Sequence, residues 1–180
     1  MEPQQRQPVI EELASTEARL LNTLDGLMPA QWHFRESPSR WSIAENLEHL
    51  IAFEGFILAA IRRTLDAPPE LDKMAAAVAK EHLVLSLAQS RDTKFLAREI
   101  VRPTGRWTGT TAMIEEFHQA RGATIAFVND TRFPLREHFF PHIAFGDLDC
   151  YQWLIVLGQH TGRHVAQIEQ IKADRAYPTT

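Results

Sequence analysis

The sequence predicts an all-α protein, a four-helix bundle with a long crossover between its second and third helices. Four long segments repeat apolar residues at helical spacing, and apolar and polar residues nowhere alternate over a stretch long enough for a strand. The chain has 180 residues, of which 44% are hydrophobic and 23% are charged, so it can form one domain with a substantial core. We expect this domain to span residues 9–173, with mobile tails at 1–8 and 174–180.

The first helix is expected from Val9 to Met28. Pro29 ends it, because proline cannot continue a helix. Apolar residues recur at intervals of three, four and seven positions and form one apolar stripe: Ile10, Leu13, Leu20, Leu24 and Leu27.

The second helix is expected from Ser42 to Leu65, before the Pro68-Pro69 pair. Ser42 and Glu45, three residues later, form the pattern of a capping box, which satisfies free backbone N–H groups at a helix start. The segment is apolar on almost every side.

The third and fourth helices are expected at residues 110–129 and 149–173. The fourth begins at Asp149, and Gln152 three residues later predicts a second capping box. The third carries an apolar stripe made of Ile114, Phe117, Ile125 and Val128.

Two connections need explanation. Residues 66–109 are far too many for an ordinary loop of a bundle, so this crossover must form a lid or contain a helix of its own. Residues 71–90 predict such an extra helix, because they are rich in Ala, Leu and Lys and contain neither Gly nor Pro. Residues 133–146, with two prolines and several phenylalanines, are expected to form a packed irregular linker.

Composition argues against several classes of partner. The net charge is −4 and the basic residues are scattered along the chain, so nucleic acid is not expected as a partner. The most apolar stretch, LIAFEGFILAAI, is short and contains Glu54, and the first residues lack the apolar core of a signal peptide, so we expect no membrane segment and no export. The single cysteine, Cys150, suits a cytoplasmic location and is expected to be a small packing residue.

Histidines are the residues with the clearest chemical meaning. His160 and His164 are four positions apart in the fourth helix, on the face that also carries Trp153, Leu157, Ile168 and Ile171. His49 lies on an inward stripe of the second helix. Two interpretations are open: separate buried histidines bonded to helix neighbours, or three imidazoles that share a divalent metal.

Three segments carry a resemblance to a known family. WSIAENLEHL, FPHIAFGDLDCYQWL and HTGRHVAQIEQI resemble, in order and spacing, the DinB/YfiT-like superfamily. The resemblance implies a four-helix bundle with a long crossover between helices two and three, often dimeric, and a divalent metal bound by His49, His160 and His164. Members with an assigned activity resemble thiol-dependent transferases, isomerases or hydrolases, and many have none assigned.

An open three-histidine site predicts a metal-dependent enzyme. Three neutral ligands favour Zn²⁺ or Ni²⁺ over Mg²⁺ and Ca²⁺, and the free position could activate a water or a low-molecular-weight thiol against a small-molecule substrate. The first alternative is a non-catalytic metal-binding bundle that acts as a stress-related binding protein. The second is a metal-free bundle.

Three residues are candidates for a catalytic role beside the metal: Arg121, His118 and Glu45. Arg121 and His118 share the inner face of the third helix, where Arg121 either anchors a carboxylate of the substrate or forms a structural ion pair. Glu45 either completes the capping box or orients His49. Surface or linker roles are expected for the other four histidines, His33, His82, His138 and His142.

A homodimer is expected from a second apolar face on helix two, opposite His49. One helix with two apolar faces has only one bundle interior to fill, unless the extra helix at 71–90 covers the second face. The residues of this face are Ile43, Leu47, Ile51, Leu58 and Ile61.

Overall fold

The computed structural model describes residues 1, 3–86, 97–107 and 109–179. Within these ranges the protein is predominantly helical. The α-helices are α1 (Pro3–Leu24), α2 (Pro29–His33), α3 (Ile43–Leu65), α4 (Met74–Leu85), α5 (Thr110–Asp130) and α6 (Cys150–Lys172). Short 3₁₀ turns are η1 (Leu71–Lys73), η2 (Glu99–Val101) and η3 (Leu135–Glu137), and two strands are β1 (Phe139–His142) and β2 (Gly146–Asp149).

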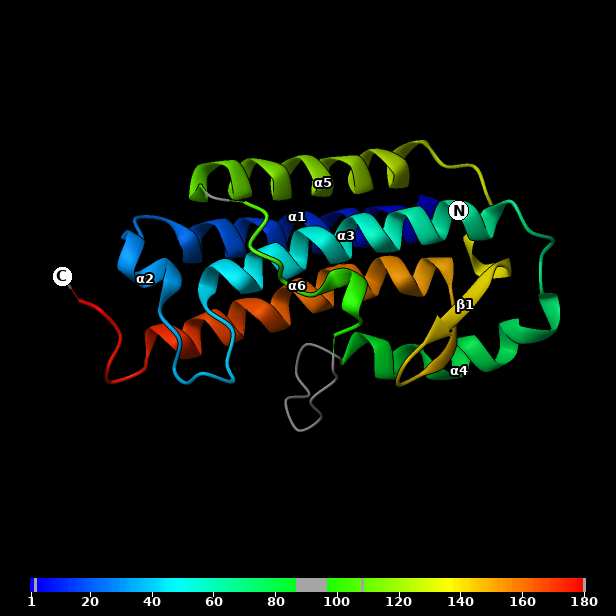
Figure 1. Cartoon of the computed structure of the whole chain (residues 1–180). Coiled ribbons are helices and arrows are strands. Elements are labelled where there is room, and N and C mark those ends of the chain that lie inside the picture. Colours follow the sequence, from blue (N-terminus) through cyan, green and yellow to red (C-terminus); the bar gives the residue numbers. More distant parts are fainter. Residues whose placement is uncertain (2, 87–96, 108, 180) are drawn as a thin grey trace.

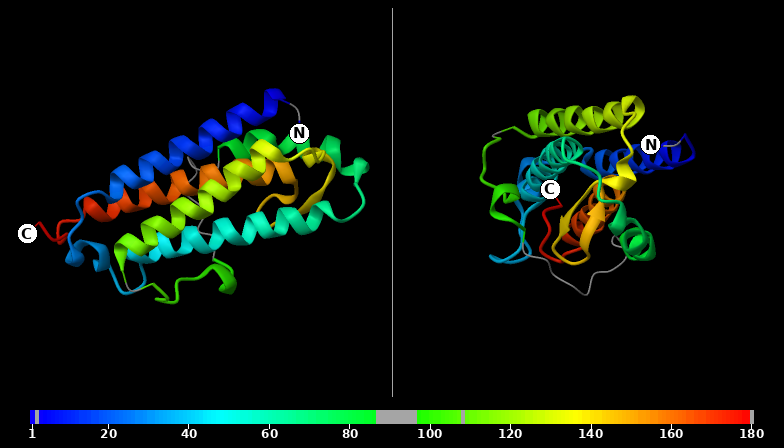
Figure 2. Two further views of the ribbon diagram at one scale, coloured as in Figure 1. Left: turned by 90° about the horizontal axis from the view of Figure 1, so that it is seen from above. Right: turned by 90° about the vertical axis from the view of Figure 1, so that its right-hand side faces the viewer.

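The four long helices α1, α3, α5 and α6 lie side by side (Figures 1 and 2). Helices α1 and α3 each contact both α5 and α6, while α4 packs on α6. The two strands and the N-terminus lie at one end of the long helices, and α2 and the C-terminus lie at the other (Figure 1).

Both predicted capping boxes are confirmed. The Ser42 hydroxyl accepts a hydrogen bond from the Glu45 backbone N–H at 3.3 Å, and the Glu45 carboxylate accepts one from the Ser42 N–H at 2.8 Å. Asp149 and Gln152 make the equivalent pair of bonds at the start of α6. These caps set where α3 and α6 begin, and both helices carry the candidate metal ligands.

The all-α prediction needs one correction. Residues 139–149 form an antiparallel hairpin of β1 and β2, in a region that we expected to be an irregular linker. Gly146 has a φ of +66°, which a glycine adopts without strain, and the Trp153 indole N–H donates to the Phe140 carbonyl at 3.1 Å. Each strand has four residues, too few for a visible alternation of apolar and polar positions.

The first helix also differs from its prediction. It begins at Pro3 and ends at Leu24, because Gly26 takes a φ of +67° and turns the chain before the short α2. Residues 3–8, expected to be mobile, are helical, and the Arg6 guanidinium donates to carbonyl groups at the C-terminal end of α5. At the other end of the chain, Tyr177 packs edge-on against Phe34 with 5.5 Å between ring centroids. Both expected tails therefore contact the body of the protein.

The crossover contains a helix, as predicted. Helix α4 covers residues 74–85 of the expected 71–90, and residues 87–90 lie outside the described ranges. This helix does not cover the second apolar face of α3. The five residues of that face are at most 6% exposed in the isolated chain, and α5 is the helix that lies along α3.

Among the described residues, no helix is both long enough and apolar enough to cross a membrane.

Candidate metal centre

Three histidine side chains meet between α3 and α6. His49 comes from the second turn of α3, and His160 and His164 come from successive turns of α6. The Nε2 atom of His160 lies 3.2 Å from that of His49 and 3.3 Å from that of His164. The three residues predicted as metal ligands are thus brought together, with one ligand atom from each within 4.8 Å of the others.

Neighbouring oxygen atoms set the orientation of two of the rings. His49 Nδ1 lies 2.7 Å from the Val101 carbonyl oxygen, and His164 Nδ1 lies 2.7 Å from Asn46 Oδ1. Both oxygens can only accept, so both Nδ1 atoms carry the proton. The Nε2 atoms of His49 and His164 are therefore unprotonated lone pairs that point toward His160.

This arrangement fits a bound cation. A protonated His160 Nε2 could donate to one of the two lone pairs but not to both, so one lone pair of the cluster is left without a donor from these three rings. A tetrahedral Zn²⁺ with Zn–N bonds of about 2.05 Å separates its nitrogen ligands by about 3.3 Å. The two observed separations are close to that value. His160 Nδ1 is buried and has no hydrogen-bond partner among the described residues.

The protein environment keeps the three rings neutral. Burial lowers the pKa of His49, although the Val101 carbonyl partly opposes this effect. Burial and then the neighbouring charges lower the pKa of His160 and His164 well below the usual value. Neutral imidazole is the form that binds a metal, so the site does not need to lose protons near pH 7.

Glu48, the neighbour of His49, holds the crossover against α3. Its buried carboxylate accepts hydrogen bonds from the backbone N–H groups of Thr104, Gly105 and Arg106 and from the Thr104 hydroxyl. Burial alone would raise the pKa of Glu48, but these hydrogen bonds outweigh it and lower the pKa. Successive residues of α3 thus bind residues 101–106, Glu48 through its carboxylate and His49 through its ring.

The three imidazoles lie in the wall of a cavity of about 910 Å³. Trp41 and Phe53 cover the rings, with Trp41 centred 4.9 Å from His49 and Phe53 stacked 4.1 Å from His160. The size is within the range of small-molecule sites, and the wall combines aromatic groups with a few polar ones. Trp41, which directly precedes the Ser42 cap of α3, is thus a lining residue of this cavity.

Arg121 lies outside the residues that line this cavity. Its guanidinium is fully buried and bonds Thr16 of α1, Glu54 of α3 and Thr161 of α6, with 2.9 Å to the Glu54 carboxylate. These four polar residues come one from each long helix. On its own helix, each lies between apolar residues of two separate core clusters. The geometry is that of the structural ion pair, one of the two interpretations left open above.

The other two catalytic candidates also have structural partners. His118 is largely exposed and lies 2.8 Å from Glu17 of α1, so it does not approach the three clustered histidines. Glu45 lines the cavity, but its carboxylate caps α3 and pairs with Arg35. Val101, not Glu45, accepts the bond from His49.

Several site residues escaped sequence analysis. Asn46 and Glu48 follow the Ser42 cap, yet no motif marks them, and Val101 acts through a backbone carbonyl that any residue could supply. His142, expected in a surface or linker role, lines the cavity, and His138 is buried at 5% exposure. His33 and His82 are exposed as expected.

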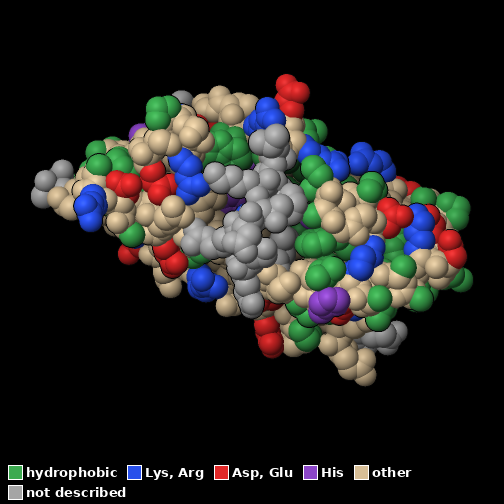
Figure 3. All heavy atoms as spheres, turned by 90° about the horizontal axis from the view of Figure 1, so that it is seen from below, with side chains coloured by type: hydrophobic (Ala, Val, Ile, Leu, Met, Phe, Trp, Pro, Cys, Tyr) green, Lys and Arg blue, Asp and Glu red, His purple; other side chains and the backbone are tan. Residues whose placement is uncertain are grey.

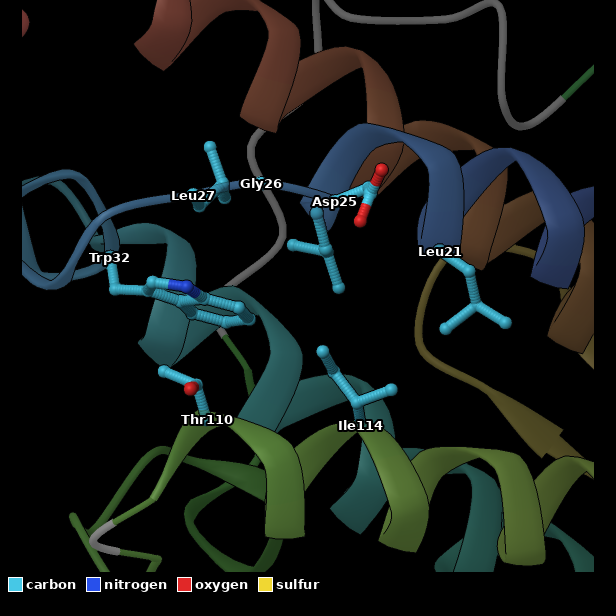
Figure 4. A pocket seen from close by; sticks show the side chains of 8 residues that line it. Leu21, Asp25, Gly26, Leu27, Trp32, Thr110 and Ile114 are labelled. Atoms are coloured by element: carbon cyan, nitrogen blue, oxygen red, sulfur yellow. The ribbon is translucent and has the colours of Figure 1, made fainter. Parts of the chain in front are cut away.

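A second, smaller cavity of about 360 Å³ lies near the end of α1 and the start of α5. In Figure 4 Leu21, Trp32 and Ile114 surround it, with Asp25 at its edge. Its lining contains none of the three histidines, so we assign it no chemistry.

Comparison with known proteins agrees with the geometry. The chain is 29% identical over 160 residues to the uncharacterized protein YuaE of Bacillus subtilis (strain 168), an alignment that covers 87% of this chain and 93% of the relative. The search of solved structures found no match. Residues 12–168 match the DinB superfamily, a span that includes all three histidines of the cluster. The chain therefore belongs to the DinB superfamily.

Proposed function

We propose that this protein is a metal-dependent enzyme, of thiol-dependent S-transferase or hydrolase type, built on the four-helix bundle of its superfamily. The proposed ligands of the divalent cation are His49, His160 and His164. The observation that carries the proposal is the convergence of three neutral imidazoles in a cavity wall, two with their Nε2 lone pairs directed inward. Nitrogen ligands of this kind favour Zn²⁺ or Ni²⁺.

The cation would lower the pKa of a bound water or thiol and so supply a nucleophile near pH 7. The chain itself contributes orientation and shelter. Asn46 and Val101 hold two rings in the ligand tautomer, and Trp41 and Phe53 shield the rings from water. Three protein ligands would leave a catalytic metal a coordination position for water or substrate.

One observation favours a second candidate, a non-catalytic metal-binding protein. Among the three predicted catalytic residues, Arg121 and His118 lie away from the cavity and Glu45 already has two partners. Within the described part of the cavity wall, His142 is a further candidate base, but burial and the nearby Arg98 charge lower its pKa to about 4. A base of that strength accepts a proton poorly near pH 7.

Metal content of protein purified without a polyhistidine tag tests the site. We expect about one Zn²⁺ or Ni²⁺ per chain, lost in the His49, His160, His164 triple alanine variant. His118→Ala is the matched control, because it removes an exposed histidine with no part in the cluster. Full occupancy in the triple variant would refute the site.

Activity is tested separately on the metal-loaded protein. Thiol transfer to small electrophiles and hydrolysis of small esters and amides should each be measured against the triple variant. Turnover that depends on the three histidines supports the enzyme. A protein that binds metal and turns over none of these substrates would favour the binding-protein alternative.

A further inference from the structure

The 910 Å³ cavity extends along α3 and α6, two helices that run in opposite directions (Figure 1). Asn46 in the first turn of α3 contacts His164, whereas His49, one turn later, contacts His160, which comes earlier in α6. The histidine cluster therefore divides the lining residues of these two helices into two halves. We call them the hairpin half, toward the start of α6, and the α2 half, toward the start of α3.

The hairpin half presents apolar side chains. Its lining residues from the two helices are Phe53, Phe56, Ile57, Trp153 and Val156. The one polar group among these five side chains is the Trp153 indole N–H, which already donates to the Phe140 carbonyl at 3.1 Å. Phe140 also stacks on Trp153, with 4.4 Å between the ring centroids. The two helices therefore offer a ligand apolar surface here, much of it aromatic.

The α2 half presents two polar side chains that lack hydrogen-bond partners among the described residues. They are Trp41, at its indole N–H, and Gln167, at its amide, and neither group is completely buried. Glu45 in the same half is different, because its carboxylate caps α3 and pairs with Arg35. A ligand that covers Trp41 and Gln167 must replace their hydrogen bonds to solvent, since leaving these groups unpaired weakens binding.

Both polar groups lie on one side of the histidine cluster. The centre of the Trp41 ring is 4.9 Å from that of His49. On the other side, Phe53 stacks on His160 with 4.1 Å between the ring centroids. Gln167 lies two turns beyond His160 on the same face of α6, about 10 Å along the helix axis. A ligand that reaches from Phe53 to Gln167 therefore passes the three imidazoles.

The hydrogen-bonding groups of the α2 half match a carboxamide. The Trp41 N–H can only donate, whereas the Gln167 amide both donates and accepts. A carboxamide on the ligand supplies a carbonyl oxygen for these donors and an N–H for the Gln167 oxygen. On the face drawn in Figure 3, basic and acidic side chains are interspersed, without a continuous area of one sign that would favour a charged ligand instead.

We propose that the cavity binds a neutral small molecule with an aromatic body and a terminal carboxamide, in a single orientation. The body lies against Phe53 and Phe56, and the carboxamide bonds Gln167 and Trp41, so Gln167 determines specificity. The inference rests on the proposed function in one respect, that the electrophilic atom of such a substrate would lie between its two ends, opposite the proposed metal. Binding itself needs only the side chains of the two halves.

A pair of isosteric ligands tests the carboxamide end. The probes are 6-phenylhexanamide and 7-phenylheptan-2-one, in which a methyl group replaces the amino group while the phenyl ring, chain and carbonyl stay the same. Calorimetry on chelator-treated protein measures their dissociation constants. We expect the amide to bind roughly three- to tenfold more tightly, the net effect of one hydrogen bond. A merely apolar cavity would prefer the ketone, because burying an amide without a partner is costly.

Gln167→Leu tests the assignment of this hydrogen bond, since leucine has a similar size and no polar group. The preference for the amide should disappear, while the ketone binds within about twofold of its wild-type affinity. Phe56→Ala tests the other end and should weaken both ligands by the same factor, about tenfold. Gln119→Leu is the control and should keep the preference, because Gln119 is an exposed residue of α5 outside the cavity wall. Circular dichroism follows the fold of each variant.

Equal affinity for the two ligands, or a preference for the amide that survives in the Gln167→Leu variant, would overturn the proposal. Loss of affinity for one ligand alone in the Phe56→Ala variant would also overturn it. Because the chelator-treated protein contains no metal, the two proposals fail separately. A protein that prefers the amide but binds no metal would refute the proposed function and retain the binding orientation, and metal binding without the preference would do the reverse.

Discussion

At the scale of single residues, Asn46 holds His164 through the 2.7 Å contact between its Oδ1 and the Nδ1 of the ring. Its amide N–H group donates to the Ser42 carbonyl, which establishes that the oxygen faces the histidine. Asn46 is fully buried, so water cannot replace it as the acceptor. One side chain in the first turn of α3 thus determines which nitrogen of His164 is available to a metal.

We predict that Asn46→Ala weakens metal binding by about 10–100-fold, the usual cost of losing a group that orients a ligand. Asn46→Asp keeps an acceptor oxygen at the same place and should retain most of the affinity. Competition with a chromophoric chelator measures both dissociation constants. Equal affinity in the alanine variant and the wild type would mean that His164 needs no orienting group.

Cys150 is a cysteine whose burial determines its reactivity. It is fully buried at the start of α6, and burial, together with the Asp149 charge, raises the pKa of its thiol to about 12. The thiolate is the reactive form. We therefore predict that iodoacetamide leaves the native protein unmodified at about pH 8 and alkylates it once it is unfolded in guanidinium chloride. Mass spectrometry measures the modification, and rapid labelling of the native protein would contradict the buried position.

Sequence alone predicted the meeting of the three histidines better than it predicted their environment. His160 and His164 stood out because helical periodicity brings residues four apart to one face, and His49 because its stripe faces inward. Val101 could not be found in this way, since its contribution is a backbone carbonyl. Arg121 was correctly placed on an inner face, but its partners come from three other helices, and periodicity within one helix does not identify them.

At the scale of secondary-structure elements, the adjacent residues Glu48 and His49 attach α3 to the crossover. We predict that Glu48→Gln speeds hydrogen exchange at the amides of residues 104–106 and weakens metal binding, because the amide offers one acceptor oxygen in place of two. Glu99→Gln changes an exposed carboxylate in the same segment and is the control. Unchanged exchange rates in the Glu48 variant would show that the loop is held by other contacts.

Arg121 links α5 to the three other long helices. We predict that Arg121→Met destabilises the protein by about 3–5 kcal/mol, because it leaves the Glu54 carboxylate buried without its counter-ion. The double variant Glu54→Met, Arg121→Met removes both charges and should be more stable than the single variant. Chemical denaturation measures both free energies of unfolding. A single variant as stable as the wild type would contradict this structural role.

Two features of the fold could not be predicted from the sequence: the β1–β2 hairpin and the C-terminal end of α1. The β1–β2 hairpin has strands of four residues, which are too short for a pattern of period two. The end of α1 was placed four residues too late, because Leu27 and Met28 continue the apolar spacing, whereas the positive φ of Gly26 ends the helix before them. Long periodic helices were predicted well, since each turn adds to the same signal.

At the scale of the whole molecule, α5 removes the reason that sequence analysis gave for a homodimer. The second apolar face of α3 is buried within a single chain, so it does not need a partner. A dimer stays a prediction that rests on the family resemblance. Light scattering at micromolar concentration distinguishes a mass of 20.5 kDa from twice that value. A monomer would contradict the dimer while leaving the metal site intact, because all three ligands come from one chain.

The separation of the ligands along the chain has a consequence for biosynthesis. His49 and His160 are 111 residues apart, and the cluster forms only where α6 lies against α3. A growing chain on the ribosome presents His49 long before α6 has been made, so the complete set of ligands cannot capture a cation during translation. Domains generally fold as units, and closing so long a segment requires the core to be largely in place. Loading of the proposed metal would therefore be a late step, after the last long helix has docked, and the chain's own packing would have to guide its folding until then.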